Sequence, residues 1–287
     1  MSGPTVYMAD GSSTLGVGRA NKTTSGNLSR FIKTVNWGTA ENTQFGHPSP
    51  TGAGFVRTGS AIATPRTVSM TIVSEWASTN AERNLLDEAN DDLPGLFAPG
   101  RGEWDLRVDR TDSGGSATSR ILTVDTTSIP DVYTADRILY RDNTAWIEWD
   151  VVLTAGFPLW RDRSAVTVDT VATTGGADAW GAYVNGGMEA CGLKATVSNV
   201  AGVVTSFVIA CTEHGTSATW TDAGFANNDT LDWMVTDPQA VSWTDGGAIT
   251  AASEIGLARG SNSGTITRTG GTAATITLTA RRYWKGF

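Results

Sequence analysis

The residues best suited to catalysis or metal binding are few in this chain and lie far apart in the sequence. There are two histidines, His47 before a proline and His214 in an E-H-G turn, and two cysteines, Cys191 and Cys211. The sequence has no H-E-x-x-H or C-x-x-C motif and no G-x-S-x-G motif that would serve a histidine. We therefore predict no enzyme, no metal site and no cofactor.

Paired carboxylates are the other pattern that could do chemistry. Glu148 and Asp150 share one face of a predicted strand, and Asp229 and Asp232 lie close in sequence. A glycosidase needs two carboxyl groups about 5–10 Å apart in a cleft. An acidic β protein offers such pairs by chance, so we do not predict glycoside hydrolysis.

Eleven tryptophans raise the hypothesis of saccharide binding. An exposed indole can stack on a pyranose ring, and Trp180, Trp220, Trp233 and Trp243 all lie in the second half of the chain. The competing interpretation is packing in cores and interfaces, where tryptophan is common. The sequence leaves both open.

The composition limits the class of protein. The 287 residues suffice for two domains, and the abundant glycine with only 17% charged residues is typical of a mainly β chain with many turns. The formal net charge of −8, with no basic cluster beyond Arg281-Arg282, argues against sequence-specific nucleic-acid binding. No apolar run approaches the ~20 residues that span a bilayer.

The first half alternates as strands do, with one helix. Val68, Met70 and Ile72 fall on one face of a strand, and another strand covers residues 144–153. A helix is predicted over 79–93, because Thr79 and Glu82 form a capping box. We expect an extended arm over 1–30, a β-sandwich over 31–165, and loop-like structure over 41–59.

The second half, 166–287, predicts an all-β sandwich, because short strand-like runs and turn signals recur every 8–12 residues. The Gly270-Gly271 pair predicts a hairpin of strands 263–268 and 274–281, and the aromatic end Tyr283-Trp284 predicts a terminus tied into a sheet. For Cys191 and Cys211 we expect two small buried residues, with a cross-strand disulfide as the alternative.

The order of these parts resembles the distal tail proteins of long-tailed bacteriophages. In the first half the resemblance rests on P-R-T-V-S-M-T-I-V, A-E-R-N-L-L, W-D-L-R-V, R-I-L-T-V and W-I-E-W-D-V-V-L-T-A running into G-F-P-L-W-R-D. In the second half it rests on V-N-G-G-M-E-A-C-G-L-K-A-T-V, N-N-D-T-L-D-W and R-G-S-N-S-G-T-I-T. Asn228 stands where the family usually has glycine.

The resemblance implies a fold and a role. The first domain would be a β-sandwich with a helix and would form a ring with its copies, usually a hexamer, around a lumen through which DNA passes. The second would be a galectin-like sandwich. The ring would join the tail tube to the hub at the tail tip and to receptor-binding or fibre proteins, in a virion made in the host cytoplasm.

We expect the ring interface in segments 41–59, 64–73 and 146–153, with the candidate residues Val68, Met70, Ile72, Trp146, Glu148 and Asp150. Two alternatives remain. One is a carbohydrate-binding module for host recognition, which predicts an exposed tryptophan platform. The other is a tail tube subunit, which predicts one dominant sandwich.

Overall fold

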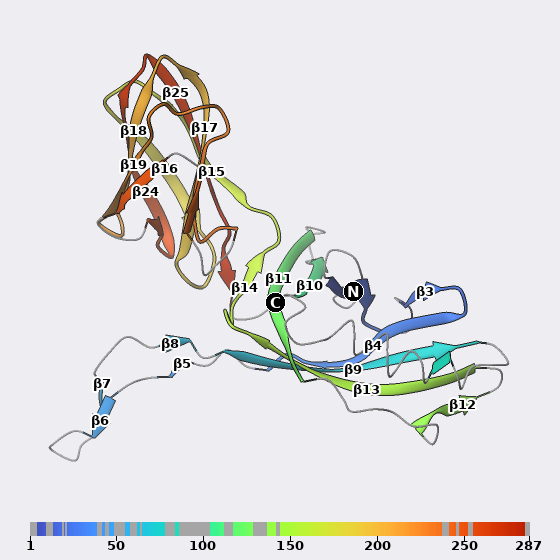
Figure 1. Cartoon of the computed structure of the whole chain (residues 1–287). Coiled ribbons are helices and arrows are strands. Elements are labelled where there is room, and N and C mark those ends of the chain that lie inside the picture. Colours follow the sequence, from blue (N-terminus) through green and yellow to red (C-terminus); the bar gives the residue numbers. More distant parts are fainter. Residues whose placement is uncertain are drawn as a thin grey trace. The chain divides into compact units, whose positions relative to one another are not determined.

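The computed structural model of the chain consists mainly of antiparallel β-strands, which confirms the predicted fold class (Figure 1). The chain divides into two compact units, Met1–Leu159 and Trp160–Gly286. The structure describes residues 5–9, 14–18, 20, 22–38, 42–43, 46–48, 55–57, 62–63, 65–77, 84–85, 104–111, 117–128, 137–141, 144–236, 241–244, 247–251 and 255–284.

The first unit is built on a sheet with the strand order β2-β1-β10-β11-β13-β9-β4-β3, and β12 pairs with β13. Residues 1–30, which we expected to form an extended arm, instead contribute strands to this sheet. The run T-V-Y-M-A becomes a strand because β10 supplies its hydrogen-bonding partner. The strands are β1 (Thr5–Ala9), β2 (Thr14–Gly16), β3 (Thr23–Ser25), β4 (Leu28–Asn36), β9 (Arg66–Trp76), β10 (Trp104–Thr111), β11 (Ala117–Ser128), β12 (Leu139–Arg141) and β13 (Thr144–Ala155).

Strand β11 divides its pairing between two neighbours. Residues 117–124 pair with β10, and residues 125–128 pair with β13, with a register shift between Thr126 and Ser128. A strand that changes partner at an irregularity bends the sheet. A parallel bridge between Val17 and Ile32 connects the two ends of the strand order. The sheet therefore curves around an apolar core.

The inner face of β9 confirms the alternation predicted from the sequence. Val68, Met70 and Ile72 are 0–2% exposed, because successive residues of a strand point to opposite faces and these three point inward. Their cross-strand partners on β13 are also buried: Leu153, Val151 and Trp149.

Segment 41–59 is not the plain loop that we expected. β5 (Asn42–Thr43) pairs with β8 (Ile62–Ala63), and β6 (Gly46–Pro48) pairs with β7 (Phe55–Arg57). The β6–β7 pairing is nested inside the β5–β8 pairing, as in a long hairpin. Of the predicted helix 79–93, Asn84 and Leu85 are helical. The rest of that prediction lies outside the described residues.

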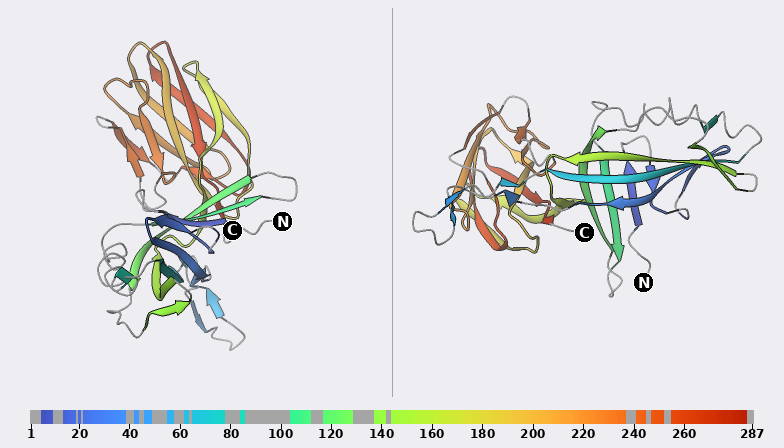
Figure 2. Two further views of the ribbon diagram at one scale, coloured as in Figure 1. Left: turned by 90° about the vertical axis from the view of Figure 1, so that its right-hand side faces the viewer. Right: turned by 90° about the horizontal axis from the view of Figure 1, so that it is seen from below.

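The second unit is a two-sheet sandwich (Figures 1 and 2). One sheet has the order β15-β25-β17-β20-β21, with β23 beside β17, and the other has the order β16-β24-β18-β19-β22. The strands are β15 (Val166–Thr173), β16 (Ala177–Asn185), β17 (Cys191–Ala201), β18 (Val204–Cys211), β19 (Thr216–Thr221), β20 (Thr230–Trp233), β21 (Val241–Trp243), β22 (Ala248–Ala251), β23 (Gly256–Leu257), β24 (Gly260–Gly270) and β25 (Ala273–Ala280).

The predicted hairpin around Gly270-Gly271 is wrong. β24 pairs with β16 and β18, whereas β25 pairs with β15 and β17, so the glycine turn crosses from one sheet to the other. Both glycines have positive φ, +78° and +60°. Arg268 fills the turn from inside and donates from Nη1 to the carbonyl oxygens of Gly270 and Gly271. These hydrogen bonds tie the Arg268 guanidinium to the backbone of the turn.

The second unit begins and ends on one short ribbon. β14 (Trp160–Asp162) pairs with β26 (Tyr283–Trp284), so the aromatic end of the chain lies in a sheet as predicted. Asp162 accepts hydrogen bonds from Arg282 Nε at 2.6 Å and from Trp284 Nε1 at 3.0 Å. These contacts hold the first and last strands of the unit together.

Candidate functional site

The six residues predicted at a ring interface separate onto two faces of one sheet. Val68, Met70 and Ile72 lie in the apolar core of the first unit. A side chain that is almost fully buried has no surface to offer a neighbouring copy, so an interface role for these three does not fit the packing. The alternation was predicted correctly, but the sequence did not say which face is covered.

Trp146, Glu148 and Asp150 lie on the opposite, outer face. Each is a cross-strand partner of an outer-face residue of β9: Glu75, Val73 and Thr71. The register continues into β4, where Phe31 pairs with Val73. The outer face of β4, β9 and β13 is therefore a continuous three-stranded surface that includes half of the predicted interface.

Polar contacts order this outer face. Lys33 Nζ lies 2.7 Å from both carboxylate oxygens of Glu148, and the hydroxyl of Thr71 donates to Asp150 Oδ1 at 2.7 Å. The side chains in these contacts are solvent-exposed, so each contact contributes little to stability, at most about 1 kcal/mol. They place one cation and two anions in defined positions on this face.

One end of the outer face is buried. Phe31 and Val73 are buried although they point outward, and Glu75 beside them is also buried. Towards Asp150 the same face is exposed. The accessible part of the surface is thus the part that carries Lys33, Glu148 and Asp150.

The four tryptophans considered for saccharide contact differ in exposure. Trp180 and Trp220 are in the core of the second unit: Trp180 donates to Ala210 O at 3.2 Å, and Trp220 packs edge-on against Phe225. Neither has a free ring face. Trp233 is half-buried, and only Trp243, at 44% exposed, presents much of its ring to solvent. A platform of all four indoles is therefore not formed.

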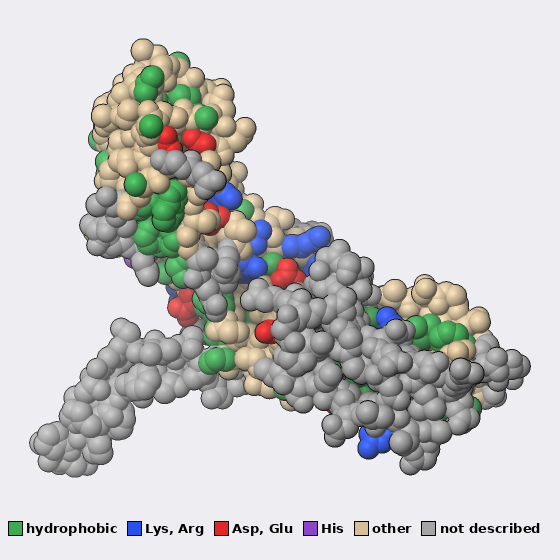
Figure 3. All heavy atoms as spheres, in the orientation of Figure 1, with side chains coloured by type: hydrophobic (Ala, Val, Ile, Leu, Met, Phe, Trp, Pro, Cys, Tyr) green, Lys and Arg blue, Asp and Glu red, His purple; other side chains and the backbone are tan. Residues whose placement is uncertain are grey.

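The outer face of the first sheet of the sandwich carries hydroxyl groups in register. Thr170 pairs with Thr277, Thr277 with Thr196, and Thr196 with Thr230, so four threonines form a row across four strands. Figure 3 shows that the visible surface of this unit is mostly uncharged. Such a surface contributes little to the electrostatic steering of a partner.

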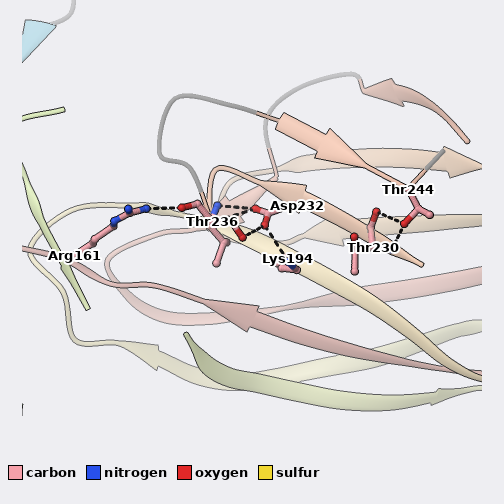
Figure 4. A network of polar contacts seen from close by, with 7 residues as sticks. Arg161, Lys194, Thr230, Asp232, Thr236 and Thr244 are labelled. Atoms are coloured by element: carbon pink, nitrogen blue, oxygen red, sulfur yellow. Dashed lines mark hydrogen bonds and ion pairs between the residues drawn. The ribbon is translucent and has the colours of Figure 1, made fainter. Parts of the chain in front are cut away.

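Asp232 is a buried carboxylate of the second unit with several hydrogen bonds (Figure 4). It accepts from the backbone N of Val235 at 2.8 Å, from the backbone N and hydroxyl of Thr236, and from Lys194 Nζ at 3.2 Å. Burial alone would raise its pKa, but the hydrogen bonds from Thr236 and Val235 prevail and lower it.

This network fixes the turn that follows β20. Arg161 Nη1 donates to Thr236 O at 2.5 Å, and the hydroxyl of Tyr283 donates to Met234 O at 2.8 Å. Residues of β14, β17 and β26 thereby meet at one turn, and Figure 4 shows the contacts from Arg161 of β14 and Lys194 of β17. Asp229, which the sequence placed near Asp232, binds the backbone N of Ala226 instead, so the two carboxylates serve separate turns. Each carboxylate is thus accounted for by the turn that it stabilises.

The two cysteines are free thiols, and both are buried. The disulfide alternative is therefore not realised. Burial raises the pKa of the Cys191 thiol to about 12, and burial also raises that of Cys211. His214 lies in the turn before β19, and His47 lies in β6.

Within the ranges that the structure describes, no three His, Cys, Asp or Glu side chains are grouped as a metal site would require. In the same described ranges, no helix is long and apolar enough to cross a membrane.

No family model and no curated protein matches the sequence. Among solved structures the chain is similar to the crystal structure of the SPP1 Dit (gp 19.1) protein, described as a paradigm of the hub adsorption apparatus in phages that infect Gram-positive bacteria. The TM-score is 0.56 at 12% identity, and the match covers 96% of this chain and 98% of the other. The likeness is one of fold, and it extends over both units.

Proposed function

We propose that this chain is a structural protein of a bacteriophage tail, a distal tail protein whose copies form a ring at the tail tip. The observation that carries the proposal is the similarity of fold to the SPP1 Dit protein along nearly the whole of both chains. A tail tube subunit would need one dominant sandwich, and here a second unit of 127 residues, Trp160–Gly286, accompanies the first.

The outer face of β4, β9 and β13 is the surface that supports ring formation best. It is continuous, and its accessible part carries both signs of charge within one row of contacts. A ring needs a head-to-tail interface, in which this face meets a different surface of the next copy. The tube above, the hub below, and fibre or receptor-binding proteins are the other proposed partners.

Mass measurement of the purified protein under native conditions tests the proposal most directly. We expect an assembly of six copies and, in negative-stain images, single thin rings. A monomer at micromolar concentration contradicts ring formation, and long tubes would favour a tube subunit instead.

A pair of variants tests whether the outer face of β4, β9 and β13 forms the ring interface. Asp150→Arg places a large cation on the proposed interface, and we expect it to leave the fold intact and to reduce the measured mass to that of a monomer. Thr277→Arg makes the same kind of change on the outer face of the second unit and is the control. Rings that persist in Asp150→Arg would contradict this choice of interface.

Saccharide binding is a second candidate, favoured only by the exposed ring of Trp243. It predicts binding to host surface glycans that Trp243→Ala abolishes. A glycan array without binding contradicts it and leaves the structural role unaffected.

A further inference from the structure

We propose that the free edge of β21 is a strand-addition site, where an extended, uncharged segment of a different tail protein pairs with the backbone of Val241 and Trp243. The identity of the partner as a tail protein rests on the proposed function. The open edge itself follows from the hydrogen-bonding pattern of the sheet.

The pattern fixes which backbone groups point outward. Thr244 N donates to Thr230 O at 3.0 Å, and Thr230 N donates to the hydroxyl of Thr244 at 2.7 Å, so the backbone groups of these two residues point towards each other at the end of the β20–β21 ladder. Such pairs alternate along an antiparallel ladder, so Asp232 and Ser242 form the next one. The N–H and C=O groups of Val241 and Trp243 therefore point away from β20.

The other side of β20 requires the same alternation. Val197 N donates to Asp229 O at 2.9 Å, and Val197 O accepts from Asn228 N at 2.8 Å, so Val197 bonds towards the chain that leads into β20. Leu231 and Trp233 then bond towards β17, and Thr230 and Asp232 bond towards β21. The contacts on the two sides of β20 therefore agree on which backbone groups of β20 point towards β21.

β21 is an end strand, and no described strand pairs with its outer edge. All three of its residues are exposed, Val241 at 37% and Trp243 at 44%. The sequence V-S-W has no charge and no proline, and no register shift interrupts its pairing with β20. Charges, prolines and bulges are the usual devices that prevent an edge from accepting another strand.

The edges on the opposite side of the sandwich carry such devices. β15 has a register shift between Thr167 and Asp169, and the Asp169 carboxylate accepts from the backbone N of Thr170 and of Gly181 in β16. β16 has its own shift after Gly181, with Ala182 at a φ of +59°. The Asp169 carboxylate and the register shifts protect those two edges. β21 has neither a charged side chain nor a register shift.

The chemistry of the edge defines the partner. Outward N–H and C=O groups alternate at a spacing that only an extended backbone matches. Trp243 is held by a hydrogen bond from Nε1 to Gly247 O at 2.9 Å, so its ring is a fixed apolar surface beside the edge. A segment with small or apolar side chains fits there, and a charged one would lose solvation.

A second copy of β21 is not the partner that we propose. Pairing of two identical edges is isologous and gives two-fold dimers, whereas a ring uses head-to-tail contacts. Two residues offer only two donors and two acceptors, so one site binds weakly. Several sites in a ring bind a multivalent partner far more strongly.

Hydrogen exchange of intact tail particles tests the inference. In the isolated chain the amides of Val241 and Trp243 should exchange quickly, and in tails at least about tenfold more slowly. If the chain is absent from tails, the proposed function is wrong, and so is the identification of the partner as a tail protein. A chain that is present in tails but exchanges equally fast at both amides overturns only the strand-addition site.

Two variants separate the edge from the fold. Val241→Pro removes an outward donor and leaves the β20–β21 hydrogen bonds in place, since proline is tolerated on an edge strand. Val241→Lys adds a charge at the same exposed position, and it serves if the proline variant does not fold. We expect both to keep the unfolding midpoint of the unaltered chain and to lose the protection of Trp243 in tails. Tails of either variant that retain this protection would refute the site.

Discussion

The indole of Trp180 lies directly against the α-carbon of Gly264 on the neighbouring strand. A methyl group placed on Gly264 would come within 2.6 Å of Trp180 Cε2 and would also collide with the carbonyl oxygen of Ala210. Trp180 is 2% exposed, so it cannot move aside into solvent. Glycine at position 264 is thus a packing requirement of the second unit.

Gly264→Ala should therefore lower the free energy of unfolding by about 3 kcal/mol, because overpacking a rigid core displaces backbone as well as side chains. Urea unfolding followed by tryptophan fluorescence measures it. Gly176→Ala is the control, since the nearest atom to its new methyl group, Thr174 Oγ1, would lie 3.9 Å away. Equal stability of the two variants would contradict this packing.

Arg268→Met should destabilise the second unit by about 2–4 kcal/mol. The guanidinium of Arg268 donates to Thr173 Oγ1 and to the carbonyl oxygens of Gly270, Gly271 and Thr272, and methionine leaves these acceptors without a donor. Arg259→Met, at an exposed position, should change the free energy of unfolding by less than about 0.5 kcal/mol. Chemical denaturation of both variants compares them, and similar midpoints would contradict the role of Arg268.

Asp232 should make stability depend on pH in the acid range. Its pKa is lower in the folded protein than the ordinary value of 3.8, so the carboxylate stabilises the fold above that value. The stabilisation is lost as the pH falls from 3.8 through the lower pKa of the folded state. Asp232→Asn should cost about 2 kcal/mol at neutral pH and progressively less below pH 3.8.

Unfolding curves of the unaltered chain and Asp232→Asn at several pH values give this difference. Lys194→Met tests the ion pair separately, because it leaves the hydrogen bonds from Val235 and Thr236 in place. A difference between Asp232→Asn and the unaltered chain that stays constant down to pH 2 would show that Asp232 does not titrate as described.

The thiols should be unreactive in the folded protein. Cys191, with a pKa raised to about 12 by burial, carries almost no thiolate at pH 8, and Cys211 is buried as well. Iodoacetamide at pH 8 should leave both unmodified, whereas treatment in denaturant should alkylate both, as mass spectrometry detects. Rapid alkylation of the folded chain would contradict the burial of these thiols.

The sequence predicted periodicity well and pairing partners less well. The alternation at Val68, Met70 and Ile72 identified one face of β9, because alternation is a local property of a strand. Whether that face is core or interface depends on the strands that cover it, and those come from distant parts of the chain. The same limit applies to Trp180 and Trp220, whose type suggested a ligand surface and whose positions make them core.

The crossing at Gly270-Gly271 shows that a turn sequence predicts where the chain reverses but not which strands pair. A Gly-Gly pair between alternating runs is typical of a hairpin, and the two runs are indeed strands. They do not pair with each other, because each is paired on both sides with other strands, β24 with β16 and β18 and β25 with β15 and β17. The open edge of β21 likewise became visible only once the order of the sheet and the phase of its hydrogen bonds were known.

Trp160 and Trp284 are cross-strand partners, so the first and the last described residues of the second unit lie side by side. A module whose two ends are held by one strand pair can be exchanged for another of different size without moving the two strands that anchor it. Replacing residues 163–281 by a short turn should therefore yield a shortened protein whose first unit is unchanged. The same attachment gives an engineer a position at which to graft a foreign binding domain onto each copy.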